Sequence, residues 1–527
     1  MRVFPFQDLP DGETFDFVVV GSGFGGSVAA LRLAQKGYSV AVLEAGRHFE
    51  DADFPESNWR LRRYLWLPRL FLYGIQRLTF LRGLLVLSGA GVGGGSLVYA
   101  GTLLEPGARF YESPECARLD PNLKERLAPH FAAAKRMLGV AENPRLTEAD
   151  EALRSVAKDL GREATFHRTK VGVHFGEPGK TVPDPYFGGE GPERAGCVFC
   201  GGCMVGCRHN AKNTLTKNYL HLAARSGARI FEGCQLSRLR DEGGDFRLTV
   251  SRPGWSVGRK TVRAKRLVFA AGVLGTMRLL LDHQDALPRL SPRVGHFVRT
   301  NSEVILGAMT PGAPRAAAPG VALSSGMWPA DDTHVEVVRY PDGSDAMALL
   351  GLRQTPPGSS ARKLAALVSL WLTRPLESLR FALPFGWAAR SAILLVMQTR
   401  DARLRLARGA LGLKAQPEAG CAPPPTALPL ADDVLARFAR KTKAVPFAAL
   451  GGGLLGVSTT AHILGGAVMA KTKEEGVCDP AGRLFGYEDR LWVCDGSLIP
   501  ANLGVNPSLT IAALAEQAMS LLPAKAA

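Results

Sequence analysis

The chain has 527 residues, of which 46% are hydrophobic, and it carries a formal net charge of +16 at pH 7. A chain of this length is too long to fold around one simple hydrophobic core, so we expect a globular protein with two closely joined domains. The first residues show no apolar signal segment, and no run of about 20 uncharged apolar residues follows, which excludes a predicted transmembrane helix. We therefore expect a cytoplasmic protein whose positive charge favours phosphate-bearing cofactors or an anionic membrane surface.

Residues 15–47 contain a short apolar strand, a glycine turn, a helix rich in small residues and a second strand. Gly21, Gly23 and Gly26 form a G-x-G-x-x-G sequence between the first strand and the helix. Such glycines provide a tight turn, room for a pyrophosphate and close packing of helix against strand, and the helix N-terminus favours the anion. Glu44 ends the second strand 18 residues after Gly26, where it is placed to accept hydrogen bonds from ribose hydroxyls. The pattern predicts a dinucleotide site.

Two segments mix aromatic and aliphatic side chains with arginine: residues 58–88 and residues 361–390. The first suits either an interfacial membrane segment or a segment folded over a cofactor with its arginines reaching to solvent. The second suits a lid or a membrane-docking excursion at a substrate entrance. Both alternatives stay open for each segment.

A glycine-rich loop follows at residues 89–101, where backbone can approach a flat ligand closely. Its sequence VGGGSLVYAG resembles the flavin-contacting loop of the glucose-methanol-choline (GMC) oxidoreductases, in particular their cholesterol-oxidase-like branch. Residues 266–281 are similar to a second signature of that family, and residues 491–519 resemble its closing segment. Residues 103–190 and 355–450 match the family weakly.

The resemblance implies an α/β fold, α+β overall: a Rossmann-like FAD-binding domain and a substrate domain with a mainly antiparallel sheet. The FAD-binding domain would comprise residues 1–105, 191–300 and 451–527, and the substrate domain residues 106–190 and 301–450. Tyr99 stands where the family often has Asn, so an Asn-specific contact is not expected there. The implied FAD-binding residues are Gly21, Gly23, Gly26, Glu44, Gly91, Gly95, Ser96, Tyr99, Ala271, Gly272, Asp495, Gly496 and Asn506.

Strand-like runs separated by turn residues occupy residues 302–310, 334–340, 346–352 and 393–406. Strands in series predict a largely antiparallel sheet, which by the resemblance would form the floor of the substrate domain over the flavin. Residues 415–432 are expected to be an irregular connection, followed by a helix over 432–443.

His462 and Asn506 match the His and Asn pair of the cholesterol-oxidase-like enzymes. The resemblance implies that His462 is the base that binds the substrate hydroxyl, and that Asn506 orients the substrate oxygen. Glu336 is a further candidate for an active-site carboxylate on a strand. The alternative for Glu336 is an ordinary exposed side chain opposite Arg339.

Cys197, Cys200, Cys203 and Cys207 have the spacing C-x2-C-x2-C-x3-C on a glycine-bearing loop. This spacing matches the ferredoxin pattern for a 4Fe–4S cluster, although Arg208 replaces the proline that usually follows. Structural zinc bound by four thiolates and a metal-free reduced loop are the alternatives.

We expect FAD-dependent oxidation of a hydrophobic alcohol, a sterol or a long-chain alcohol, by proton abstraction and hydride transfer to flavin N5. The acceptor of the electrons would be a quinone, a cytochrome or oxygen, and a cluster would favour a dehydrogenase over an oxidase. The alternatives are a non-redox isomerisation on the same fold and a redox-inactive, membrane-associated lipid-binding flavoprotein. Nucleic acid is excluded as a partner, because no binding motif accompanies the dispersed basic residues.

Overall fold

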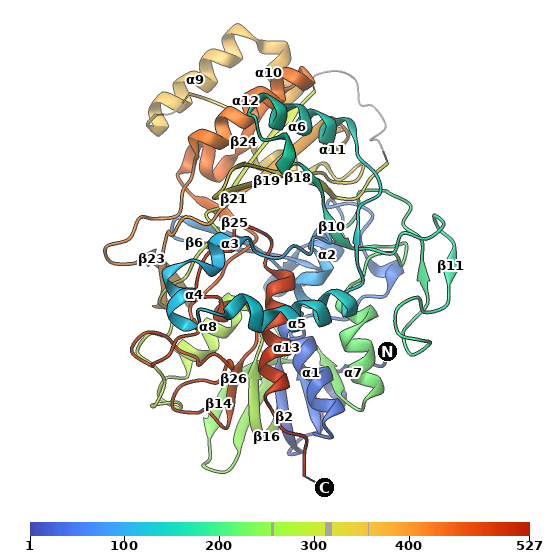
Figure 1. The fold of residues 1–527 in the computed structure, drawn as a ribbon, viewed down its shortest axis with the longest axis vertical. Helices are drawn as coiled ribbons and strands as arrows, with labels where there is room; N and C mark the ends of the chain where they lie inside the picture. The colour runs from blue at the N-terminus through green and yellow to red at the C-terminus, as the bar shows by residue number, and fades with distance from the viewer. Residues whose placement is uncertain (255–257, 311–318, 357, 411, 527) are drawn as a thin grey trace.

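The computed structural model describes residues 1–254, 258–310, 319–356, 358–410 and 412–526. Two large β-sheets dominate the structure, one in the lower and one in the upper half of Figure 1. Within the described ranges, no helix is long and apolar enough to span a membrane.

The lower sheet has eight strands, in the order β1-β13-β3-β2-β16-β15-β14, with β26 pairing with β16. Strands β1, β13, β3, β2, β16 and β26 run parallel to one another. Strands β15 and β14 continue the sheet beyond β16 and are antiparallel to their neighbours. Strand β2 is buried on both faces over Phe15–Val20, as expected for a parallel strand covered on both sides. The strands are β1 (Phe4–Pro5), β2 (Thr14–Val20), β3 (Val40–Leu43), β13 (Arg229–Glu232), β14 (Gln235–Asp241), β15 (Phe246–Ser251), β16 (Arg259–Phe269) and β26 (Leu491–Val493).

Helices from distant parts of the sequence pack together beside this sheet. Helix α1 (Phe24–Gln35) contacts α7 (Tyr219–Arg225) and α13 (Ser508–Ser520), and α13 also contacts α5 (Leu123–Met137) (Figure 1). A bidentate ion pair between Arg32 and Glu516, at 2.7 Å, joins α1 to α13. The N-terminal dinucleotide unit is therefore completed by the last described helix.

The upper sheet has seven antiparallel strands, in the order β20-β24-β17-β21-β19-β18-β9. Its core lies under α6 (Glu148–Asp159) and α12 (Pro429–Thr442), whose apolar residues pack on one face of the sheet. The prediction of a mainly antiparallel sheet is confirmed. The strands are β9 (His167–Arg168), β17 (Val304–Met309), β18 (Leu323–Ala330), β19 (Thr333–Val338), β20 (Gly351–Arg353), β21 (Ser391–Gln398) and β24 (Val445–Ala449).

Some expected elements differ from the structure. Residues 346–352 are mostly a 3-10 helix, η7 (Asp345–Leu350), and β18 was not predicted. The run 393–406 divides into β21 and β22 (Leu404–Gly409), and β22 pairs with β23 (Gly412–Pro417) outside the sheet. The helix expected from residue 432 begins at Pro429.

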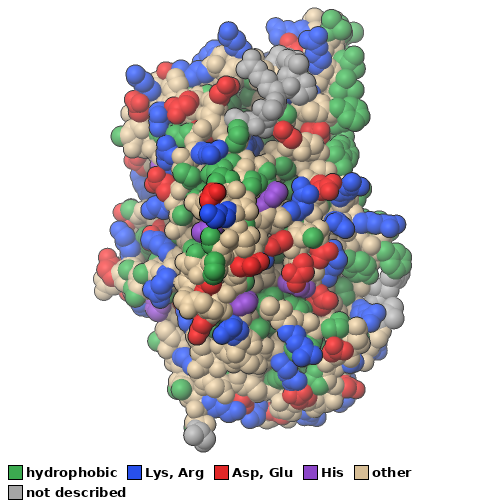
Figure 2. Space-filling view, turned by 90° about the vertical axis from the view of Figure 1, so that its right-hand side faces the viewer, with side chains coloured by type: hydrophobic (Ala, Val, Ile, Leu, Met, Phe, Trp, Pro, Cys, Tyr) green, Lys and Arg blue, Asp and Glu red, His purple; other side chains and the backbone are tan. Residues whose placement is uncertain are grey.

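The remaining elements are short or peripheral. Strands β6 (Gln76–Leu81) and β7 (Leu84–Gly89) form a hairpin that β25 (Ser458–Thr460) extends into a three-stranded sheet. Figure 2 shows hydrophobic side chains gathered along one edge of the molecule, with lysines and arginines beside them. The other elements are α2 (Leu61–Tyr64), β4 (Trp66–Leu67), β5 (Leu72–Tyr73), α3 (Ala108–Tyr111), α4 (Pro114–Leu119), β8 (Val140–Glu142), β10 (Lys170–Gly172), β11 (Thr181–Val182), β12 (Arg194–Ala195), α8 (Gly272–Asp282), α9 (Ser360–Thr373), α10 (Pro375–Ala382) and α11 (Trp387–Arg390).

Candidate active site

The glycine turn after β2 is closely packed at Gly21, Gly25 and Gly26 but open at Gly23. A Cβ at Gly25 would lie 1.7 Å from the Cys494 carbonyl oxygen, and one at Gly26 would lie 2.1 Å from the Gly21 carbonyl oxygen. Gly21 has a φ of +103°, which a side chain rarely allows. A Cβ at Gly23 would meet nothing within 4 Å. The open side of Gly23, at the N-cap of α1, therefore fits the pyrophosphate of a dinucleotide.

Glu44 lies at the end of the second strand, as expected, and its carboxyl group is buried. It accepts hydrogen bonds from the Ser22 amide (3.1 Å), the Ser22 hydroxyl (2.6 Å) and the Gly46 amide (2.8 Å). Burial raises the pKa of Glu44, and these three donors partly offset that effect. A ribose hydroxyl at Glu44 would have to share the carboxylate with Ser22.

The glycine loop of residues 89–101 lies directly against the dinucleotide turn. The Gly93 amide donates to the Ser22 hydroxyl at 3.0 Å. A Cβ at Gly94 would lie 2.8 Å from the Gly23 Cα, so the two loops touch through their backbones. At Gly95 the nearest atom to an added Cβ is a Phe24 ring carbon at 3.7 Å, which leaves this glycine more open.

Two predicted flavin-binding side chains of this loop are engaged within the protein. The Ser96 hydroxyl donates to the Gly93 carbonyl at 2.7 Å and accepts from the Leu215 amide at 3.0 Å. The Tyr99 hydroxyl donates to the Asn213 carbonyl at 3.1 Å. Their side chains hold the loop in place, and their role towards FAD stays a prediction.

The segments around residues 271 and 495 meet at the ends of β16 and β26. The Thr276 hydroxyl donates to Asp495 at 2.5 Å, and Asp495 also accepts from the Ser497 amide at 2.8 Å. Gly272, just after Ala271, has a φ of +73°, and an added Cβ there would meet nothing within 4 Å. Gly496 accepts a hydrogen bond from the Gly465 amide at 2.9 Å, which brings the chain following His462 to this edge.

His462 and Asn506, which are 44 residues apart in sequence, meet in the interior. The Asn506 amide nitrogen lies 3.5 Å from His462 Nε2 and donates to Glu336 Oε2 at 3.2 Å. The buried oxygens Asn506 Oδ1 and Glu336 Oε1 have no hydrogen-bond partner among the described residues. Unsatisfied buried polar atoms at one point are typical of a site that receives a ligand or water. The structure thus brings together all three residues predicted to be catalytic.

Glu336 is fully buried, so the alternative of an exposed side chain is wrong. On β19, Val335 and Val337 face the helices of the upper sheet, and alternation turns Glu336 to the opposite face. Burial raises the pKa of Glu336 to about 8, although His462 and Asn506 oppose this shift. His334, on the same face, lies 3.7 Å from Glu336, and burial holds its pKa well below the ordinary value.

Glu303 is a candidate functional residue that the sequence analysis missed. Its Oε2 atom lies 3.1 Å from His462 Nδ1 and accepts hydrogen bonds from the Thr460 hydroxyl (2.8 Å) and the Ala461 amide (3.0 Å). Its side chain is completely buried. Burial, the largest single influence, lowers the pKa of His462, but the charge and hydrogen bonding of Glu303 together with the charge of Glu336 outweigh it, so that this pKa is raised. The sequence signal that could have pointed to Glu303 was its position as an acidic residue immediately before an apolar strand.

The four cysteines of residues 197–207 do not form the predicted metal site. Among the residues that the structure describes, no three His, Cys, Asp or Glu side chains are grouped so that they could hold a metal ion. Cys200 is exposed, whereas Cys197 and Cys203 are buried, and burial raises the pKa of Cys197 to about 12 and that of Cys203 to about 11. The described residues therefore lend no support to the predicted iron–sulfur cluster or to the alternative zinc site.

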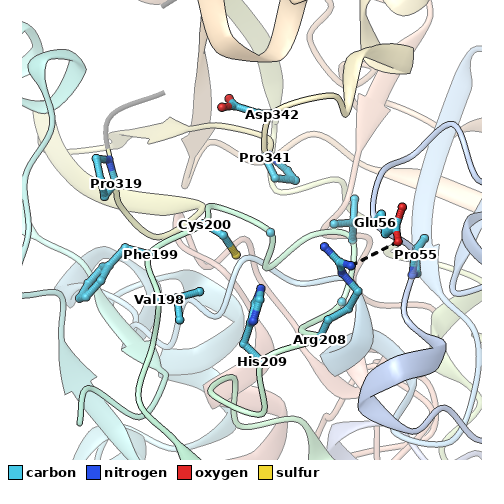
Figure 3. A pocket seen from close by; sticks show the side chains of 13 residues that line it. Pro55, Glu56, Val198, Phe199, Cys200, Arg208, His209, Pro319, Pro341 and Asp342 are labelled. Atoms are coloured by element: carbon cyan, nitrogen blue, oxygen red, sulfur yellow. Dashed lines mark ion pairs between the residues drawn. The ribbon is translucent and has the colours of Figure 1, made fainter. Parts of the chain in front are cut away.

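The loop instead borders a surface pocket of about 370 Å³. Figure 3 shows Cys200, Arg208 and His209 on one side of this pocket, with Arg208 paired to Glu56 at 3.6 Å. Lys212, which follows the four cysteines, is buried and donates to the carbonyls of Leu97 (3.0 Å) and Cys203 (2.7 Å).

The fold and the dinucleotide turn define a dinucleotide-binding protein, and the family matches make the chain an FAD-dependent oxidoreductase. Residues 16–346 match a family model described as FAD dependent oxidoreductase, and residues 447–515 match one described as GMC oxidoreductase. The chain belongs to the GMC oxidoreductase family, in its cholesterol-oxidase-like branch.

The chain is similar to known proteins over nearly its whole length. The chain is 45% identical to a cholesterol oxidase of Mycobacterium tuberculosis, over 97% of this chain and 91% of the relative. It is 39% identical to a cholesterol oxidase of Acinetobacter baumannii, over 97% and 95% of the two chains. Among solved structures, pyridoxine 4-oxidase from Mesorbium loti has a TM-score of 0.61 at 16% identity, covering 96% of this chain and 98% of that one. This last similarity concerns the fold.

Proposed function

We propose that the chain oxidises the hydroxyl group of a hydrophobic alcohol, a sterol or a long-chain alcohol, with FAD as its cofactor. The convergence of His462, Asn506, Glu336 and Glu303 carries this proposal. The names of the relatives support it: two are cholesterol oxidases, and a third, 25% identical over 94% of this chain and 65% of the relative, is a long-chain-alcohol oxidase of Arabidopsis thaliana.

His462 has the geometry of a general base. Its Nδ1 atom faces the Glu303 carboxylate, so Nε2, on the side of Asn506, is left to accept the proton of the substrate hydroxyl. The charge of Glu303 then stabilises the imidazolium that forms. Asn506 lies within reach of the same oxygen and fixes its position. Bound FAD would supply the acceptor for the hydride that leaves the carbinol carbon.

The residues proposed to hold FAD are the turn at Gly21, Gly23 and Gly26, the neighbouring loop with Gly91 and Gly95, and the edge at Gly272 and Asp495. The open backbone positions Gly23 and Gly272 support this assignment, because a Cβ added at either glycine would meet no atom of the described residues within 4 Å outside its own stretch of chain. The remaining predicted contacts of Glu44, Ser96, Tyr99, Ala271, Gly496 and Asn506 belong to the same proposal.

We take oxygen as the electron acceptor. The preference for a dehydrogenase rested on an iron–sulfur cluster, and the cysteine arrangement removes that reason. The relatives are named oxidases, which supports oxygen over a quinone or a cytochrome. A cytoplasmic location with peripheral contact to an anionic membrane completes the proposal.

The position of Glu336 supports a second candidate activity, the isomerisation of an unsaturated ketone product. A buried carboxyl group with a pKa of about 8 can take a proton from one carbon and return it to another near neutral pH. Isomerisation involves no net electron transfer. It would be detected as conversion of a non-conjugated unsaturated ketone, supplied in place of the alcohol, into its conjugated isomer without any change in flavin absorbance.

Anaerobic mixing of the FAD-loaded protein with a sterol or a long-chain alcohol tests the main proposal. Flavin absorbance should fall with substrate, and admitting oxygen should restore it with formation of hydrogen peroxide. His462→Ala and Asn506→Ala should each slow the reduction at least about 100-fold, in the range of general acid–base contributions. His283→Ala, outside the site, serves as the control. Unchanged reduction in the His462 variant would refute the proposed base, and absence of reduction by every alcohol would support a redox-inactive lipid-binding flavoprotein.

A further inference from the structure

Helix α9 is apolar but almost unpartnered. None of its 14 residues, all of which the structure describes, is buried. Leu364, Val368, Trp371 and Leu372 are between 47% and 77% exposed. Their spacing of i, i+4, i+7 and i+8 places them on one helical face. A helix of a soluble protein normally buries such an apolar face against its own core. The apolar face of α9 is therefore free to contact apolar material outside the chain.

Helix α10 continues the apolar surface and is firmly attached to the body. Leu376 and Leu379 are 70% and 48% exposed. Arg353 of β20 pairs with Glu377 and donates to the Ser378 hydroxyl at 3.0 Å, and Ser378 is buried. The α9–α10 hairpin, at the top of Figure 1, therefore projects its apolar residues from a fixed base.

Neighbouring segments add to the same region. The Ala346 amide at the start of η7 donates to Asn58 Oδ1 at 3.0 Å, which joins η7 to the segment that follows Asn58. Asp345, in the same helix, accepts from the Gly386 and Ala388 amides beyond α10. We call this region the docking surface; its exposed apolar residues are Trp59, Leu61, Leu349, Leu364, Val368, Trp371, Leu372, Leu376, Leu379, Leu383 and Phe385.

The docking surface is also strongly basic. Residues 58–71 contain four arginines and no acid, and residues 358–390 contain five lysines and arginines and one acid, Glu377. Glu377 is already paired with Arg353. Figure 2 shows such basic side chains beside the hydrophobic ones along one edge of the molecule. Apolar side chains flanked by arginines match the acyl boundary and the phosphates of an anionic membrane.

We propose that the docking surface binds the surface of an anionic lipid bilayer, with α9 and α10 lying in the headgroup region. With about 1.5 Å of rise per residue, the 14 residues of α9 extend roughly 21 Å, too short for a hydrocarbon core of about 30 Å. The surface therefore lies on the membrane and does not span it. A second copy of the chain fits less well, because its docking surface would bring the same excess of positive charge.

The position of the docking surface connects it to the proposed reaction, and this part rests on the proposed function. The Ser360 hydroxyl at the start of α9 donates to the Leu454 carbonyl at 3.0 Å. Leu455 is 61% exposed, and seven residues later the chain reaches His462 in the interior. Seven residues span at most about 25 Å. A hydrophobic alcohol leaving the bilayer at the docking surface would thus travel a short way to the catalytic base.

Flotation of the FAD-loaded protein with vesicles of phosphatidylcholine and phosphatidylglycerol, without substrate, tests the inference. We expect binding to vesicles with 30% phosphatidylglycerol, at least 10-fold weaker binding to pure phosphatidylcholine, and a decrease with added salt. Leu372→Asp combined with Leu376→Asp should lower binding at least 10-fold. Arg374→Glu combined with Arg380→Glu should do the same. Leu521→Asp, at a leucine that is 63% exposed on the C-terminal segment, should leave binding unchanged.

Equal binding of the Leu372 and Leu376 variant and the unchanged chain would overturn the inference. So would light scattering that shows a dimer which these substitutions dissociate, because the surface would then be an interface between copies. Oxidation of an alcohol dissolved in detergent should be unaffected by the substitutions, whereas oxidation of the same alcohol embedded in vesicles should slow. Vesicle binding without any alcohol oxidation would refute the proposed function and leave the docking surface established.

Discussion

The candidate site concentrates groups that exchange protons in a place where water is scarce. His462, Glu303 and Glu336 are all buried or nearly so, and the pKa values of His462 and Glu336 depend on the charges of their neighbours. Interactions between charges are stronger in such a low-dielectric environment than at the surface. Substituting one member should therefore change the titration of another, and two predictions at the scale of single residues follow that logic.

Glu303→Gln should weaken His462 as a base. The substitution keeps the shape of the side chain and removes the charge that raises the pKa of His462. The neutral imidazole is the active form, so the acidic limb of kcat/KM should move to lower pH, and kcat/KM should fall about 10- to 100-fold. A pH profile of alcohol oxidation measures both effects. If Glu303 is only structural, the limb will stay where it is in the unchanged chain.

Glu336→Gln should change how stability depends on pH. The folded pKa of about 8 lies above the ordinary value of 4.5, so the folded chain holds a proton between these values that the unfolded chain releases. The stabilisation is complete below pH 4.5 and is lost as pH rises through 8. Relative to the variant, the unchanged chain should lose up to about 1.4 kcal/mol per pH unit across this window. Thermal unfolding of both proteins at pH 5, 7 and 9 measures the difference, and parallel Tm curves would contradict it.

The sequence predicted His462, Asn506 and Glu336 as site residues, but not the residues that surround them. His462 and Asn506 were identified through a resemblance, and the structure places them together. The alternation in THVEVV is equally typical of a strand with one exposed face. Only the packing of the rest of the molecule against that face buries Glu336. Glu303 was missed for the same reason, since its partner lies 159 residues away in sequence.

At the scale of elements, α9 and α12 form an informative pair of equal length. Each has 14 residues, yet α12 buries five of them under the upper sheet, whereas α9, described throughout, buries none. Packing, and not helix propensity, supplies most of the stability of a helix in a protein. The two helices should therefore respond very differently to the loss of one leucine.

Leu435→Ala in α12 should lower the free energy of unfolding by about 2 to 5 kcal/mol, because Leu435 is 1% exposed and its loss leaves a cavity. Leu372→Ala in α9 should change it by less than about 0.5 kcal/mol, because Leu372 is 77% exposed. Urea unfolding of the two variants without lipid compares them directly. A large loss at Leu372 would mean that α9 is packed against a partner in solution.

The sequence predicted strands and loops best where a local pattern decides them. The dinucleotide turn and the antiparallel sheet were predicted from glycine spacing and strand-like runs. Residues 346–352 look like a strand in composition, but most of them form η7, whose Asp345 fixes the chain beyond α10. The cysteine spacing suggested a metal, yet spacing alone cannot determine the directions of the sulfur atoms. The division into two domains stays a prediction.

At the scale of the whole molecule, one sheet draws its strands from three distant parts of the chain. Strands β1 to β3, β13 to β16 and β26 come from its beginning, middle and end. A ligand held where these parts meet stabilises all of them, because it binds the folded and not the unfolded chain.

FAD should therefore raise the Tm of the apoprotein, with a gain of about 2.7 kcal/mol at 100 times the Kd. Gly23→Ala should leave the apoprotein as stable as before, since Gly23 has a φ of −70° and space for a Cβ, but should weaken FAD binding at least 10-fold. Gly25→Ala should destabilise the apoprotein itself, because its Cβ would overlap the Cys494 carbonyl. Thermal unfolding with and without FAD distinguishes the two variants. Full stabilisation of the Gly23 variant by FAD would place the pyrophosphate elsewhere.

The pairing of β26 with β16 also sets an order of events during synthesis. Strand β26 pairs with Leu267–Phe269, and Cys494 just beyond it packs on Gly25 of the first glycine turn. The ribosome adds roughly 5 to 20 residues per second, so the turn near residue 25 waits many seconds for its final neighbour. The nascent N-terminal half thus carries an uncovered apolar edge at Leu267–Phe269 until residues 491–493 have been synthesised. Cofactor loading is then a late event, and chaperones that shield such edges would determine how much active protein accumulates.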